Sequence, residues 1–100
     1  MYIAMNRFRI ALGREDAFEE QWRSRESQLD KVPGYREFHL LRGPSSEECT
    51  LFVSHTLWES SKHFVDWTES EAFKKAHGKA RSPEGTHLGP PQFEGFEIVI

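Results

Sequence analysis

Residues 58–80 place an imidazole and an indole where the two rings could share a ligand. His77 follows Phe73 by four residues, so both side chains share one face of a predicted helix. Trp67 precedes His77 by ten residues, which is about 15 Å along a straight helix. Rings at this separation could flank one large, flat ligand. A lone helical histidine is more often an ordinary core or surface residue, and the spacing alone leaves both interpretations open.

The apolar periodicity predicts the elements that position these side chains. Strand-like patterns occur over 2–10, 35–42, 50–58 and 93–100. Helical spacing of apolar residues predicts helices over 14–31, 60–67 and 69–79. Thr68 stands three residues before Glu71, the capping-box spacing expected at the start of the third helix. Glycine and proline mark two loops, 43–46 and 81–92, of which the second is expected to be mobile and to line or cover a site.

The order strand, helix, strand, strand, helices, strand is the split βαβ pattern of ferredoxin-like α+β folds. We therefore predict a single domain over 1–100, with one antiparallel sheet and helices on one of its faces. The other face also carries apolar side chains, which strand alternation assigns to Ile3, Met5, Leu51 and Val53. A small monomer rarely leaves such a patch in water, so we expect a second copy of the chain to cover it in a homodimer.

Three further side chains are candidates because of their places in these elements. Asn6 falls on the strand face that carries Phe8, among mostly apolar neighbours. A buried amide needs partners, so Asn6 either bonds to a neighbouring loop or serves a ligand. Trp22 and Arg25 follow Phe18 on the apolar stripe of the first helix. Arg25 either covers the edge of the core with its stem or binds an anion at the mouth of a cleft.

Composition and missing motifs exclude several classes of function. The net charge is −3 and basic residues are interleaved with acidic ones, unlike the basic surface of a nucleic-acid-binding protein. No apolar run is long enough for a membrane span and residues 1–8 lack the apolar core of a signal peptide, so we expect a cytoplasmic protein. Cys49 is alone, and the five histidines show no zinc-binding spacing. The sequence also lacks a P-loop, a GxGxxG fingerprint and a GxSxG nucleophile elbow.

The segment LWESSKHFVDWTESEAFKKAH resembles the corresponding stretch of the IsdG-type haem-degrading monooxygenases, within the antibiotic-biosynthesis-monooxygenase superfamily. That family pairs a tryptophan at a W-x-x-S-x-x-F helix junction with a histidine ten residues on, and has an asparagine in an Asn-Arg pair on its first strand. The matching residues of this chain are Trp67, His77 and Asn6. The resemblance covers nearly the whole chain, including the Pro-Gly-Tyr turn at 33–35.

The resemblance implies a dimeric α+β barrel in which each protomer binds one haem as both cofactor and substrate. His77 would be the axial ligand of the haem iron through a neutral imidazole nitrogen. Asn6 would donate a hydrogen bond to the oxygen that reacts on the open side of the iron. Trp67 would press the porphyrin out of plane, because a rigid indole in a packed wall does not yield.

The function implied by the resemblance is oxidative opening of the porphyrin ring with release of iron. Trp22, Phe73 and Arg25 would complete the haem site, the arginine by holding the propionates through two hydrogen bonds. O2 and an external electron donor would be required, since the sequence has no motif for a flavin or a nicotinamide. Two alternatives stay open: a cofactor-independent monooxygenase acting on a phenolic or polyketide substrate in the same cleft, and a haem-binding protein without turnover.

Overall fold

The computed structural model describes residues 1–24, 29–70 and 85–100. Within these residues, four strands form one antiparallel sheet in the order β2-β3-β1-β4. The strands are β1 (Tyr2–Ala11), β2 (Tyr35–Ser45), β3 (Cys49–Trp58) and β4 (Gln92–Glu97). The helices are α1 (Glu15–Arg23) and α2 (Ser61–Thr68), with a 3-10 turn, η1, at Leu29–Lys31. This arrangement is the ferredoxin-like α+β fold that the sequence predicts.

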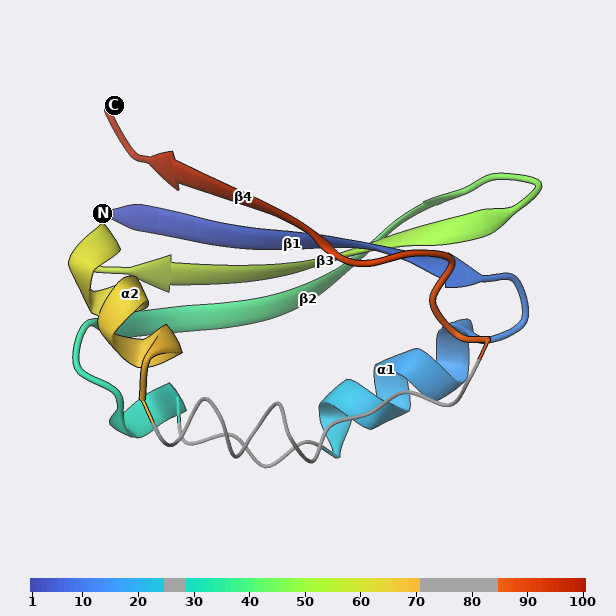
Figure 1. Cartoon of the computed structure of the whole chain (residues 1–100), viewed down its shortest axis with the longest axis horizontal. Coiled ribbons are helices and arrows are strands. Elements are labelled where there is room, and N and C mark those ends of the chain that lie inside the picture. Colours follow the sequence, from blue (N-terminus) through green and yellow to red (C-terminus); the bar gives the residue numbers. More distant parts are fainter. Residues whose placement is uncertain (25–28, 71–84) are drawn as a thin grey trace.

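Both helices cover the same face of the sheet, α1 at one end and α2 at the other (Figure 1). Alternation along β1 turns Phe8 and Ile10 toward this face, where both are buried. They join Phe18 of α1 and Phe52 of β3 in the main core cluster. The core therefore lies between α1 and the sheet, and α2 packs near the N-terminal end of β1. The helices among the described residues are too short to cross a membrane.

The opposite face of the sheet carries the other half of the strand side chains. Across β1 and β3 the register pairs Ile3 with Leu57, Met5 with His55, Arg7 with Val53 and Arg9 with Leu51. The four apolar residues predicted to share a face, Ile3, Met5, Leu51 and Val53, therefore do share it. We call this the open face, because α1 and α2 both lie on the other side of the sheet.

The first helix is shorter than the sequence predicts, since α1 ends at Arg23 and not at residue 31. Ser24 follows it as the C-cap, and its hydroxyl donates to the Glu20 carbonyl at 2.8 Å. Such a local side-chain bond competes with continuation of the helix. Pro33 also disfavours helical backbone in the residue before it, and the chain forms only the 3-10 turn η1 there.

The two edge strands also differ from their predicted bounds. β2 runs to Ser45, through most of the predicted loop 43–46, with an irregular register between Arg42 and Ser45. An edge strand tolerates Pro44, whose missing N–H would break a central ladder. The Ser45 hydroxyl lies 2.7 Å from the Thr50 hydroxyl, which reattaches the strand end to β3. At the other edge, β4 ends at Glu97.

Thr68 is the last residue of α2. Its hydroxyl donates to the Val65 carbonyl at 2.7 Å, which gives a carbonyl of the last turn of α2 a partner. Glu69 is the C-cap of α2, and its own N–H reaches the same carbonyl at 3.2 Å. Of the helix predicted over 69–79, only residues 69 and 70 are described, and residues 71–79 lie outside the described residues.

The described part of the predicted loop 81–92 is hydrogen-bonded to β1. The Ala11 N–H donates to the Thr86 carbonyl at 2.8 Å, and the Leu88 N–H donates to the Arg9 carbonyl at 2.9 Å. Thr86 is only 1% exposed. These bonds continue the pairing of the β4 side of the chain with β1, so the backbone here is fixed by the sheet.

His87 makes the stability of this fold depend on pH. Its ring lies 5.5 Å from the Phe18 ring and 5.9 Å from the Phe8 ring, and burial lowers the pKa of the imidazole from its ordinary 6.5. The unfolded chain takes up a proton that the folded protein resists. Stability is therefore full above pH 6.5 and falls as the pH drops through this value.

We expect His87→Leu to flatten this pH dependence, because leucine keeps an apolar contact and cannot be protonated. The urea midpoints at about pH 7.5 and about pH 5.5 should differ less for the variant than for the wild type. His39→Gln, at an exposed position on the open face, is the matched control and should keep the wild-type difference. If His87→Leu keeps it too, His87 is not the group that titrates.

Candidate active site

Asn6 lies midway along β1, on the face that the helices cover. It pairs with Ser54 of β3 on one side and with Phe93 of β4 on the other. The side chain is half-buried and makes no hydrogen bond to the rest of the described chain. The predicted alternative, an amide bonded to a neighbouring loop, therefore has no support among these residues. The Asn6 amide keeps two donors and an acceptor for a ligand.

Trp67 enters the same layer from α2. Its ring lies 5.5 Å from that of Trp58 and 6.3 Å from that of Phe64. Phe64 in turn stacks on Phe93, with ring centroids 5.4 Å apart and planes 5° from parallel. Because Phe93 is the β4 neighbour of Asn6, an aromatic wall connects the indole of Trp67 to the amide of Asn6. The two predicted site residues thus border one layer between sheet and helices.

The start of α2 is fixed by a close contact with the turn before β2. Gly34 has φ of +85°, and a Cβ at this position would collide with the His63 ring. The Ser60 side chain caps the helix by accepting the His63 N–H at 3.3 Å, and its hydroxyl also lies 2.7 Å from His63 Nδ1. The turn and the cap together set the direction in which α2 presents Trp67.

Trp22 reaches the layer from α1. Its ring lies 5.9 Å from that of Phe8 and stacks on Phe38 of β2 at 5.6 Å, with 14° between the planes. A groove of about 240 Å³ opens beside it between α1 and β2. Its lining combines aromatic and charged side chains: Glu19, Trp22, Arg23, Phe38, Leu40, Arg42 and Phe52.

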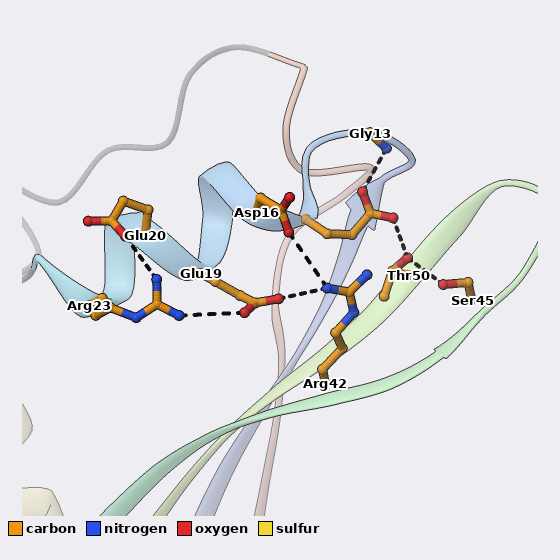
Figure 2. A network of polar contacts seen from close by, with 9 residues as sticks. Gly13, Asp16, Glu19, Glu20, Arg23, Arg42, Ser45 and Thr50 are labelled. Atoms are coloured by element: carbon orange, nitrogen blue, oxygen red, sulfur yellow. Dashed lines mark hydrogen bonds and ion pairs between the residues drawn. The ribbon is translucent and has the colours of Figure 1, made fainter.

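Ion pairs fasten α1, and with it Trp22, to the edge of the sheet (Figure 2). Arg42 of β2 lies 2.8 Å from Glu19 and 3.9 Å from Asp16. Within α1 itself, Arg23 lies 2.8 Å from Glu20 and 3.8 Å from Glu19, the carboxylate that also pairs with Arg42. Each exposed pair contributes little on its own, so their role is to favour one placement of the helix.

The N-terminal end of α1 is held at Glu15. Its carboxylate accepts the Gly13 N–H at 2.7 Å and the hydroxyl of the fully buried Thr50 at 2.8 Å. Hydrogen bonds from its own backbone N–H and from Thr50 lower the pKa of Glu15. The group therefore stays ionised at the helix terminus where negative charge is favourable.

Comparison with known proteins identifies the family of this chain. Residues 1–79 match the antibiotic biosynthesis monooxygenase family. The chain belongs to that family. A curated relative, the mycobilin-producing haem oxygenase of Mycobacterium tuberculosis, is 29% identical over 98 residues, which cover 98% of this chain and 89% of the relative.

Solved structures agree with this assignment. The haem degrader MhuD of Mycobacterium tuberculosis, solved with two haems in its active site, has a TM-score of 0.75 at 26% identity, covering 100% of this chain and 97% of MhuD. An antibiotic biosynthesis monooxygenase from Bacillus cereus has a TM-score of 0.78 at 16% identity, covering 99% of this chain and 91% of the other, which supports the fold.

Three of the predicted site residues of this monooxygenase, Arg25, Phe73 and His77, lie outside the described residues. The structure brings Asn6 and Trp67 to one aromatic wall and places Trp22 on the α1 side of the same sheet face. Among the described residues, no group of three or more His, Cys, Asp or Glu side chains could hold a metal ion.

The aromatic wall itself was not predicted from the sequence. Phe64, Phe93 and Trp58 link the monooxygenase's predicted residues, and Ser54 lies directly opposite Asn6. Strand alternation with a correct β1–β3 register would have found Ser54. The stack of Phe64 on Phe93 depends on β4 lying next to β1, which no local pattern shows.

Proposed function

We propose that this monooxygenase degrades haem, opening the porphyrin ring oxidatively and releasing iron. One observation carries the proposal: Asn6, half-buried and without a hydrogen bond in the described chain, borders the same aromatic wall as Trp67. A flat, apolar molecule with one polar reacting centre suits that combination. The 29%-identical relative is a haem oxygenase, and MhuD was solved with haem bound, which supports the choice of substrate.

Bound haem would supply the iron at which O2 is reduced and the porphyrin carbon that is oxidised, with electrons from an external reductant. His77 would hold the iron through a neutral imidazole nitrogen and leave the opposite side open. Asn6 would donate its amide hydrogen to charge that develops on the open side. Trp67, backed by Trp58 and Phe64, would form an unyielding wall against the porphyrin face.

The remaining predicted contacts concern the rim and sides of the porphyrin. Arg25 would bind the propionates through paired hydrogen bonds, and Phe73 would contact the ring from the helix that carries His77. Trp22 would contact the ring from α1, where its stacking on Phe38 holds the indole in one orientation.

Two other functions make different demands on the same residues. A cofactor-independent monooxygenase with a phenolic or polyketide substrate has no need of an iron ligand at His77. A haem-binding protein without turnover needs His77 but has no use for the Asn6 amide. Measurements of haem binding and of haem loss therefore distinguish the three functions.

The deciding experiment is a titration of the purified protein with haem, followed by a single turnover. We expect a Soret band that saturates at one haem per chain, and loss of that band with release of iron when ascorbate or a reductase is added in air. A protein that binds no haem would contradict the proposal and favour the cofactor-independent reaction. A Soret band that survives the reductant would favour the carrier.

We also expect the monooxygenase to form a homodimer through its open face. Light scattering at micromolar concentration should give twice the chain mass. Met5→Lys should shift the protein to a monomer, because a two-fold contact repeats the substitution and buries two like charges together. Ala17→Lys, at an exposed position on α1, is the matched control and should remain dimeric. A wild-type protein with the mass of one chain contradicts this prediction.

A further inference from the structure

Three easily oxidised rings, those of Trp67, Trp58 and Tyr35, lie in a row that begins at the candidate active site. The Trp67 ring lies 5.5 Å from the Trp58 ring, and the Trp58 ring lies 6.0 Å from that of Tyr35 at the start of β2. Trp58 is 0% exposed, whereas Tyr35 is half-buried and reaches solvent. The row therefore runs from the candidate active site, through the core, to the surface.

The proton chemistry differs along this row in a way that favours transfer outward. Trp58 Nε1 is buried and has no hydrogen-bond partner within the described chain, so an oxidised Trp58 has no base to take its proton. It can only take an electron from a neighbour, as a relay does. Burial and the charges of Asp30 and Glu37 raise the pKa of Tyr35, so its phenol is protonated at neutral pH. On oxidation Tyr35 can release that proton to water.

We propose that Trp67, Trp58 and Tyr35 form a path that carries an oxidising equivalent from the active site to the surface of the protein. The proposal rests on the proposed function for its oxidant, which is the one-electron oxidant produced when haem meets peroxide. That oxidant takes one electron from Trp67, Trp67 takes one from Trp58, and Trp58 takes one from Tyr35. The Tyr35 hydroxyl proton goes to water, and the external reductant later returns one electron and water returns one proton.

Such a path would protect an enzyme that generates strong oxidants beside a wall of aromatic side chains. An oxidising equivalent that stays in the buried layer would modify Trp67 or Trp58. At Tyr35 the oxidising equivalent can be reduced by the external reductant that the proposed reaction already requires. The path thus gives Trp58 and Tyr35 a task beyond packing, and neither would contact the substrate.

The chain offers matched controls for both ends of the path. Its other tyrosine, Tyr2, pairs with Trp58 across β1 and β3, but its ring contacts Phe64 at 5.8 Å and its hydroxyl lies over Gly95 of β4. The ring of the third tryptophan, Trp22, contacts the rings of Phe8, Phe18 and Phe38. Tyr2 is therefore the competing end point from which Tyr35 must be distinguished, and Trp22 is the tryptophan whose ring contacts are to phenylalanines outside the path.

Pulse radiolysis of the haem-free protein tests the path directly. Azide radicals oxidise indoles to indolyl radicals, and any later growth of phenoxyl absorption reports transfer to tyrosine. The measurement uses the Cys49→Ser protein, because a free thiol would compete for the radical. We expect the indolyl signal to convert to the phenoxyl signal at a rate independent of protein concentration.

Substitutions of the tyrosines and tryptophans identify the residues that donate the electron to the oxidised indole. Tyr35→Phe should lose the phenoxyl growth, and Tyr2→Phe should keep it. Trp58→Phe should slow or abolish the conversion, and Trp22→Phe should leave the rate unchanged. Phenoxyl growth that survives in Tyr35→Phe, or that disappears in Tyr2→Phe, overturns the proposal. The tyrosine pair decides the question even if Trp58→Phe fails to fold.

A second measurement links the path to the proposed function. Haem-loaded protein mixed with peroxide should show a tyrosyl radical by electron paramagnetic resonance, and Tyr35→Phe should lose that signal and gain oxidised tryptophan detectable by mass spectrometry. If no haem binds, the proposed function falls and the azide measurement still decides the path. If haem is degraded and Tyr35→Phe behaves as the wild type in both measurements, the path alone is wrong.

Discussion

We expect His77→Ala to lose stoichiometric haem binding or all turnover while the fold stays intact. We expect this result because the neutral His77 imidazole would be the residue that holds the haem iron in the proposed site. Losing the ligand should weaken haem affinity by at least about tenfold, or about 1.4 kcal/mol. The Soret maximum and the dissociation constant measure the effect, and circular dichroism checks the fold.

His63→Ala is the matched control for this prediction. His63 lies on α2 beside Phe64, but its Nδ1 is 2.7 Å from the Ser60 hydroxyl and its ring fills the space above Gly34. These contacts hold the imidazole at the start of α2. We therefore expect His63→Ala to keep the ligation spectrum, at some cost in stability. If His63→Ala loses the iron coordination and His77→Ala keeps it, the assignment of the axial ligand is wrong.

Strand periodicity predicted most of this fold, because the two central strands, β1 and β3, each have one face against the core. The alternation along β1 placed both Asn6 and the open-face residues correctly before any register was known. The errors fall at element ends. The first helix was predicted to run to residue 31, yet α1 ends at Arg23, and the Ser24 hydroxyl donates back to the Glu20 carbonyl. A short polar side chain can bond the backbone inside or beyond a helix, and local sequence does not decide between the two.

The candidate site was predictable only in part, for a related reason. The residues with unusual chemistry could be picked out by type and spacing, as Asn6 and Trp67 were. What surrounds them depends on sheet order. Phe93 is exposed at 49% and belongs to an edge strand, so composition gives it no special place. Its stack on Phe64 arises because β4 pairs with β1, a contact between the two ends of the chain.

Asn6→Ala should separate haem binding from haem degradation. The side chain is held by β1 between Ser54 and Phe93, so its removal leaves the neighbouring backbone in place. A donor that acts on charge developing at the reacting oxygen contributes little before O2 reacts. Losing one such donor in a dry site costs on the order of 10²-fold in rate. We therefore expect near-native haem affinity, a native ligation spectrum and haem loss slowed about 100-fold or more.

Trp67→Phe is the comparison that gives this prediction its specificity. A smaller ring still packs against Trp58 and Phe64 and still presses on the porphyrin, so the variant should keep binding and lose only part of the rate. The measurement is single-turnover haem loss with reductant for the wild type, Asn6→Ala and Trp67→Phe. It compares the loss of rate caused by each substitution. A steric role for Asn6 would give both variants similar, modest losses. Degradation by Asn6→Ala at the native rate would mean that the amide fills space on the inner face of β1 and takes no part in oxygen chemistry.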